Sequence, residues 1–279
     1  MGGIVVPILE SADPDDWGSH LFGLRQERWD ALAGRVFWIT GGGTGYGRAL
    51  ACALGAAGAK VALSGRRADK LQESADEIRD FAPDAKPLIL PLDVTESQAC
   101  RDAAERIVSA WGRLDGLVCC AALSGGNPGS ILDMDESKLR RMFEVNVLGQ
   151  ALPCRAAIGP ILRQGFGRIL LLSSGAGWGF APEVGVYNAT KSAVNAIGAS
   201  LAAEVSKKAP EADIQVNVIN PGEALTEMNR GSVISPFAVC SMALTLLSHP
   251  SGGPNGRFFH RGGRHLGFGD VPPWPHPLD

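Results

Sequence analysis

The feature that most constrains the fold is an alternation of short apolar segments and longer helical segments that begins at Arg35. The predicted strands are 35–40, 60–64, 87–92, 114–121, 168–173, 214–219 and 257–260, and the predicted helices are 46–54, 68–80, 96–111, 137–162, 186–207 and 235–247. Strands that are apolar throughout and alternate with helices form parallel sheets covered on both sides. The sequence therefore predicts an α/β fold, a doubly wound sheet of about seven parallel strands with helices on both faces.

The alternating region is flanked by two segments of different composition. Residues 1–34 carry prolines, an acidic stretch, Trp17 and Trp29, and we interpret them as an N-terminal arm. Tryptophans on such an arm pack onto the body or onto a neighbouring subunit. Residues 266–279 are rich in proline and are not expected to form a helix. The predicted cofactor-binding and catalytic domain is therefore 35–265, and the long helix 137–162 is expected to kink near Pro153.

Composition excludes several classes of protein. The net charge of −3 gives no basic surface for nucleic acid. No apolar run reaches the roughly 18–20 residues of a membrane helix, and residues 1–9 lack the basic start of a signal peptide. The six cysteines show no metal-ligand spacing, so we expect reduced thiols, a cytoplasmic location and no metal site.

A glycine-rich turn joins the first predicted strand to the first predicted helix. It runs Thr40-Gly41-Gly42-Gly43-Thr44-Gly45-Tyr46-Gly47. Gly41 would permit a tight turn, Gly45 would let the backbone approach a pyrophosphate, and Gly47 would allow the helix to pack closely on the strand. A flexible strand–helix connection is the simpler alternative. The position at the first strand–helix turn favours a dinucleotide site that also uses Thr44 and Tyr46.

The second motif is a spacing of three polar residues. Tyr187 follows Ser174 by thirteen positions and precedes Lys191 by four. On a helix, Tyr187 and Lys191 share one face, where the ammonium would lower the pKa of the phenol from about 10. Alone, a tyrosine and a lysine at this spacing most often indicate only a half-buried face of a helix.

Together the two motifs resemble the short-chain dehydrogenase/reductase family, in its single-domain branch. The resemblance extends from Arg35 to Gly263 and implies a Rossmann-like fold. It also implies roles for four residues. Ser174 would bind the substrate oxygen, Tyr187 would exchange a proton with it, Lys191 would bind the nicotinamide ribose, and Asn146 would hold a water in a proton relay.

The same resemblance implies the remaining cofactor contacts. Asp93 and Val94 match the pair that contacts adenine, and Asp93 could in addition, or instead, cap the helix that follows near Glu96. Pro221, Gly222 and Thr226 match the segment over the nicotinamide carboxamide. Ala121 matches the residue beside the adenosine ribose, in a stretch where Cys119 and Cys120 replace the usual pair of asparagines.

Cofactor choice depends on the end of the second strand. A carboxylate there would favour NAD, whereas this chain has Arg66 and Arg67. A guanidinium suits a 2′-phosphate, so NADP(H) is favoured and NAD(H) remains possible. Two solvated arginines at a helix start are the alternative interpretation.

The predicted activity is hydride transfer between NADPH and a carbonyl or secondary alcohol. Trp178, Phe180 and Met228 are candidate walls of a small-molecule pocket under a short lid segment after Thr226. A homodimer or homotetramer is expected from the resemblance. Two alternatives remain: a non-catalytic NADP-binding regulator or scaffold, and, with less support, a sugar-nucleotide epimerase or dehydratase.

Overall fold

The computed structural model describes residues 21–124, 131–133, 135–179 and 182–266. The predictions that concern residues 1–20, Phe180 and the tail 267–279 lie outside the described residues. Within the described part, no helix combines the length and the apolar character needed to cross a bilayer.

One sheet runs through the centre of the molecule. Its strand order is β3-β2-β1-β4-β5-β6-β7-β8. The strands are β1 Val36–Thr40, β2 Lys60–Gly65, β3 Leu88–Pro91, β4 Gly116–Cys119, β5 Phe166–Leu172, β6 Asp213–Asn220, β7 Arg257–His260 and β8 His265–Leu266. The first seven are parallel, as predicted, and the short β8 adds an antiparallel edge to β7. The order reverses between β1 and β4, so loops diverge there and leave a crevice at the carboxyl ends of the strands.

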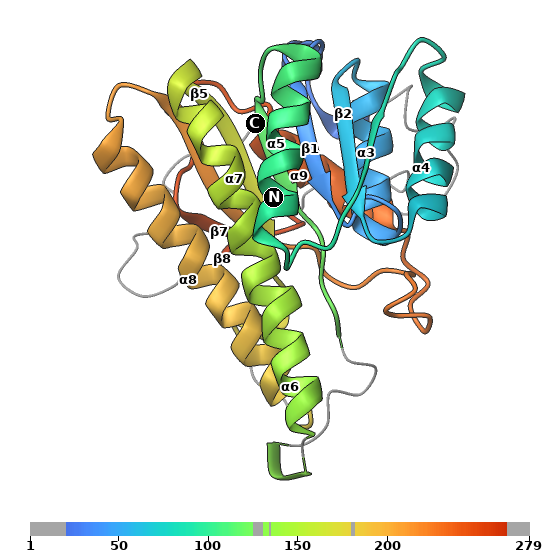
Figure 1. The fold of residues 1–279 in the computed structure, drawn as a ribbon, viewed down its shortest axis with the longest axis vertical. Coiled ribbons are helices and arrows are strands. Elements are labelled where there is room, and N and C mark those ends of the chain that lie inside the picture. Colours follow the sequence, from blue (N-terminus) through green and yellow to red (C-terminus); the bar gives the residue numbers. More distant parts are fainter. Residues whose placement is uncertain (1–20, 125–130, 134, 180–181, 267–279) are drawn as a thin grey trace, which may run out of the picture.

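Helices cover both faces of the sheet (Figure 1). One face carries α3 Gly45–Ala56, α4 Ala68–Phe81 and α9 Cys240–Leu247, and the other carries α5 Ser97–Trp111, α7 Gly149–Gln164 and α8 Gly185–Lys208. Shorter elements are η2 Leu21–Gly23, α2 Gln26–Asp30, η3 Ile131–Asp133, α6 Glu136–Phe143, η5 Gly175–Gly177 and η6 Pro236–Val239. Figure 1 shows α6 and the beginning of α8 projecting beyond the strands.

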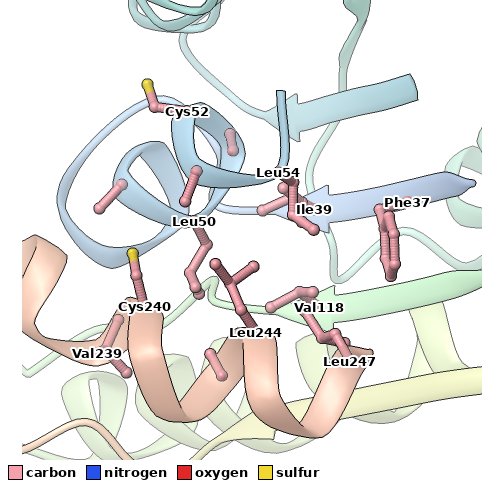
Figure 2. Packing of buried hydrophobic residues seen from close by; sticks show 14 of the residues in the cluster. Phe37, Ile39, Leu50, Cys52, Leu54, Val118, Val239, Cys240, Leu244 and Leu247 are labelled. Atoms are coloured by element: carbon pink, nitrogen blue, oxygen red, sulfur yellow. The ribbon is translucent and has the colours of Figure 1, made fainter. Parts of the chain in front are cut away.

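The core on the α3 and α9 face is a tight aliphatic layer (Figure 2). Leu50 and Leu54 of α3 meet Leu244 of α9 above Ile39 of β1 and Val118 of β4, and all five side chains are fully buried. Central strands lie between two such layers, which is why their sequences are apolar without alternation.

Residues 21–34 pack against this core. Phe22 is completely buried, and its ring stacks on Trp29 and on Phe237 of η6 at centroid distances of 6.2 and 6.5 Å. Arg28 donates hydrogen bonds to the Ser248 carbonyl at the end of α9. The last part of the predicted arm therefore behaves as part of the folded body.

The helix predicted over 137–162 is interrupted at a different place from Pro153. A wider π-helical segment, η4 Glu144–Leu148, separates α6 from α7, and Pro153 lies inside α7. The predicted kink position is therefore wrong. The wider turn is centred on Asn146, whose buried side-chain amide accepts a hydrogen bond from the Leu123 backbone. Such π-helical turns are frequent at functional sites.

Replacing Phe22 by alanine should destabilise the whole domain. Removing a fully buried aromatic ring leaves a cavity and costs about 3–5 kcal/mol of unfolding free energy. Urea denaturation measures this, and Val233→Ala, at a 93% exposed position, serves as the control with a change within about 0.5 kcal/mol. An equally small effect at Phe22 would show that residues 21–34 are not part of the cooperative unit.

Candidate active site

A cavity of about 690 Å³ lies at the carboxyl ends of β1, β2 and β4. Its size is within the range of about 300–1,000 Å³ that ligand pockets occupy. The predicted cofactor residues that line it are Gly41, Thr44, Gly45, Tyr46, Gly47, Arg66, Arg67, Asp93, Val94, Ala121 and Thr226, together with the pocket candidate Met228. The crevice therefore collects residues that are up to 187 positions apart, from Gly41 to Met228.

The glycine turn is built so that its backbone, not side chains, faces the cavity. Gly41 has φ of +66°, and a Cβ there would lie 2.8 Å from the Ala121 nitrogen. A Cβ on Gly47 would lie 2.2 Å from the Gly41 carbonyl oxygen, which no rearrangement of side chains could relieve. These positions require glycine, and they leave the N-terminus of α3 open to a phosphate.

The segment after β6 is held against this turn. The Tyr46 hydroxyl donates a hydrogen bond of 2.9 Å to the Gly222 carbonyl, and burial raises the pKa of Tyr46 to about 12. A Cβ on Gly45 would lie 3.1 Å from the Thr226 methyl group. Pro221 and Gly222 do not themselves line the cavity, but Tyr46 fixes their position beside it.

Asp93 and Val94 lie at the far end of the cavity from β6. The Asp93 carboxylate accepts hydrogen bonds from the Thr95 backbone and hydroxyl and from Arg141 at 3.0 Å. Burial opposes its ionisation, but these hydrogen bonds outweigh burial and lower the pKa of Asp93. The cap of α5 is Glu96, so the alternative role of Asp93 as the helix cap is wrong.

The two arginines after β2 differ in their surroundings. Arg66 is exposed, lines the cavity, and forms no ion pair with the described residues. Arg67 binds Glu227 through both guanidinium nitrogens, at 2.6 and 3.1 Å. Sequence reasoning missed this contact because Arg67 and Glu227 are 160 positions apart in the chain.

Asn146 ties together three parts of the chain. Its Oδ1 accepts a hydrogen bond from the Leu123 nitrogen, and its Nδ2 donates to the Leu123 carbonyl at 2.8 Å and to the Thr190 hydroxyl at 3.2 Å. The Thr190 hydroxyl in turn donates to the Tyr187 carbonyl at 2.8 Å. Since Leu123 lines the cavity, the amide connects the cavity wall to the first turns of α8.

Tyr187 and Ser174 lie close together beside the cavity. Ser174 precedes η5, where its hydroxyl accepts a hydrogen bond from the Ala176 nitrogen at 3.1 Å. Burial raises the pKa of Tyr187, and a hydrogen bond with Ser174 offsets this only in part. Lys191 therefore does not lower the pKa of Tyr187 as expected, and the phenol is protonated at neutral pH.

Lys191 lies one turn further along α8 and is almost completely buried. Its Nζ donates to the Leu172 carbonyl at 2.9 Å and lies 5.7 Å from the centre of the Tyr187 ring. Burial lowers the pKa of Lys191 to about 8. A buried ammonium with a lowered pKa is typical of functional sites.

The two adjacent cysteines face opposite sides of the sheet, as the strand pattern predicts. Cys119 packs against Cys154, with both thiols reduced. Cys120 lines the cavity near Lys191, and burial raises its pKa far above the ordinary thiol value. Both are therefore inert thiols, and the replacement of two amides leaves the cavity wall less polar.

The pocket candidates are distributed around the site. Trp178 is 55% exposed and lies beside Arg264, whose guanidinium carbon is 6.0 Å from the ring centre. Met228 is 45% exposed on the segment after β6. The described residues contain no cluster of side chains suited to hold a metal ion.

Comparison with known proteins identifies the family. The short chain dehydrogenase family profile matches residues 35–234. The chain belongs to the short-chain dehydrogenase/reductase family. It is 32% identical over 201 residues to 11-beta-hydroxysteroid dehydrogenase A from Sesamum indicum, covering 72% of this chain and 55% of that protein. It is 34% identical to the short-chain dehydrogenase/reductase GME11373 from Pestalotiopsis microspora, over 71% of each chain.

A solved structure from the family shows a similar fold with a cofactor. A short chain dehydrogenase from Shigella flexneri 2a str. 301, complexed with NADP, is 27% identical and aligns with a TM-score of 0.77. The alignment covers 84% of this chain and 99% of that one. The chain spans about half the length of the curated hydroxysteroid dehydrogenases that it matches, 55–56% of each.

Replacing Lys191 by methionine should stabilise the free protein at pH 7. Since burial lowers the pKa of Lys191 from 10.5 to about 8, the cost of the buried ammonium is fully present below pH 8 and disappears as the pH rises to 10.5. Allowing for the lost bond to Leu172, we expect a gain of about 1–2 kcal/mol.

Thermal unfolding at pH 7 and pH 10 checks this expectation. The gain should shrink at pH 10, while the exposed control Lys86→Met should change little at either pH. A loss of stability at pH 7 would mean that the Leu172 hydrogen bond outweighs the cost of burial.

Proposed function

We propose that this protein is an NADPH-dependent oxidoreductase that transfers a hydride between the nicotinamide and a carbonyl or secondary alcohol. The observation that carries the proposal is the grouping of Asn146, Ser174, Tyr187 and Lys191 beside a glycine-lined cavity. A protein that only binds a nucleotide has no need of a buried phenol and ammonium at that place.

The cavity suits a dinucleotide. Gly41 and Gly47 let the turn pack closely on Ala121 and on itself, and the N-terminus of α3 opens toward the cavity. Arg66 supplies a guanidinium near the end of β2, where the ribose 2′ position lies in dinucleotide-binding folds. The preference for NADP rests on this cation and on the absence of an acid at the end of β2, and NAD(H) is the second choice.

The bound nicotinamide would supply or accept the hydride. Ser174 holds the substrate oxygen, and Tyr187 donates a proton to it during reduction or removes one during oxidation. Lys191 binds the nicotinamide ribose. Asn146 holds the start of α8 against the cavity wall through its bonds to Thr190 and Leu123.

Support for the substrate class comes from the reacting groups. A phenol and a hydroxyl side by side suit one carbonyl or hydroxyl oxygen of a small molecule. The relatives named as 11-beta-hydroxysteroid dehydrogenases are in keeping with that class. We place the protein in the cytoplasm as a homodimer or homotetramer, and Trp178 and Met228 beside the substrate.

A non-catalytic NADP-binding regulator is the second candidate. The inert Cys119 and Cys120 in place of polar residues favour it. The sugar-nucleotide epimerase or dehydratase alternative has less support, because the described residues between β6 and β7 form only the short η6 and α9.

Replacing Tyr187 by phenylalanine should abolish turnover while NADPH still binds. The change removes only the hydroxyl that exchanges the proton, so we expect a loss in kcat of about 100-fold or more. NADPH absorbance with a panel of carbonyl compounds measures turnover, and NADPH fluorescence measures binding. Equal activity in parent and variant would exclude the proposed role of the tyrosine.

Replacing Arg66 by alanine should weaken NADPH binding about 10-fold or more and leave NADH nearly unchanged, since a charge-assisted bond to phosphate is lost. The dissociation constants of both cofactors, measured by fluorescence titration, give the ratio. The same replacement of Arg25, which is exposed outside the cavity, is the control. A parallel loss of both cofactors would refute the assignment of Arg66 to the 2′-phosphate.

A further inference from the structure

An ion pair closes the cofactor cavity at its Arg66–Arg67 end. The Arg67 guanidinium meets the Glu227 carboxylate in a two-point contact, with Nη2–Oε2 at 2.6 Å and Nη1–Oε1 at 3.1 Å. The two residues come from opposite halves of the sheet, since Arg67 follows β2 and Glu227 follows β6. Both line the cavity, and each side chain is about half exposed.

Glu227 belongs to a short loop that is closed on itself. The Leu225 nitrogen donates to the Ile234 carbonyl at 2.7 Å, and the Thr226 and Asn229 backbones bond to each other at 3.1 and 3.2 Å. The loop touches the glycine turn through Thr226 and reaches the far side of the cavity through Glu227. We call residues 225–234 the clasp loop.

The contact uses the fork of Arg67 that a phosphate would also use. A guanidinium binds carboxylates and phosphates through the same pair of parallel N–H groups. Arg66 forms no ion pair with the described residues, whereas Arg67 is already occupied. A 2′-phosphate that bound the same Nη1–Nη2 edge of Arg67 would therefore have to displace the Glu227 carboxylate, which carries the same sign of charge.

We propose that Glu227 sets cofactor specificity by competing with the cofactor 2′-phosphate for Arg67, so that NADPH, and not NADH, releases the clasp loop. The inference rests on the proposed function. In this arrangement Glu227 weakens NADPH binding. The position of the clasp loop then depends on which cofactor is bound. NADH, which has no phosphate at that position, leaves the ion pair intact.

Glu227→Gln tests the competition directly, because glutamine keeps the shape and removes the charge. Exposed ion pairs contribute little, so we expect NADPH to bind about two- to five-fold more tightly and NADH to be unchanged. Fluorescence titration at low salt gives both constants. Glu211→Gln makes the same change in net charge at an exposed residue just before β6, at the amino ends of the strands and away from the cavity. It should alter neither dissociation constant.

A second variant, Arg67→Gln, separates competition for Arg67 from direct repulsion between Glu227 and the 2′-phosphate. In Arg67→Gln, the further change Glu227→Gln should leave NADPH affinity unchanged, because the contested group is gone. A gain of the same size in that background would overturn the proposal, since the carboxylate would then act on the phosphate alone.

Hydrogen exchange provides an independent readout. NADPH should increase exchange in residues 225–234 of the parent and NADH should not. Two results would overturn the proposed competition for Arg67 and leave the proposed function standing. One is an equal effect of the two cofactors on exchange, and the other is an NADPH affinity that is the same in the parent and in Glu227→Gln. Failure of the parent to bind either cofactor would overturn both.

Discussion

The ammonium of Lys191 is buried at the carboxyl ends of the central strands, where it donates to the Leu172 carbonyl. Burial of a charge is costly unless polar partners surround it, and here the cost appears as a pKa lowered to about 8. Lys191 is only 2% exposed and is not among the residues that line the cavity, so its ammonium lies just behind the cavity wall. Cys120 and Tyr187 lie beside the ammonium. Asn146 holds α8 in place through its hydrogen bond to the Thr190 hydroxyl, one residue before Lys191.

The parallel sheet explains why these groups meet. The parallel strands β1 to β7 all end on the same side of the sheet. The turn after β1 and the arginines after β2 therefore line one cavity, and Ser174 after β5 lies at the same end of the sheet. The close contact of Gly47 with the Gly41 carbonyl brings α3 onto that edge, and the Asn146 amide brings α8 there. The same topology thus places the glycine turn and the Ser174–Tyr187 pair at one end of the sheet.

Much of this arrangement is predictable from sequence. All seven parallel strands, the glycine turn and the grouping of Tyr187 with Lys191 follow from local patterns whose periods match the structure. The π-helical turn at Asn146 does not, because an extra residue per turn leaves no mark on hydrophobic spacing. The raised pKa of Tyr187 was also missed, since spacing reveals a neighbour but not the depth of burial, and the Arg67–Glu227 pair joins segments that only the folded sheet brings together.

The central claim is that this site carries out hydride transfer and does more than hold a nucleotide. The most direct measurement is mass spectrometry of carbonyl compounds incubated with the protein and NADPH deuterated at C4 of the nicotinamide. The account predicts an alcohol product that carries one deuterium at the former carbonyl carbon, with the label taken from one face of the ring. Tight NADPH binding without deuterium in any product of a broad carbonyl panel would contradict it, and would favour a non-catalytic binding protein.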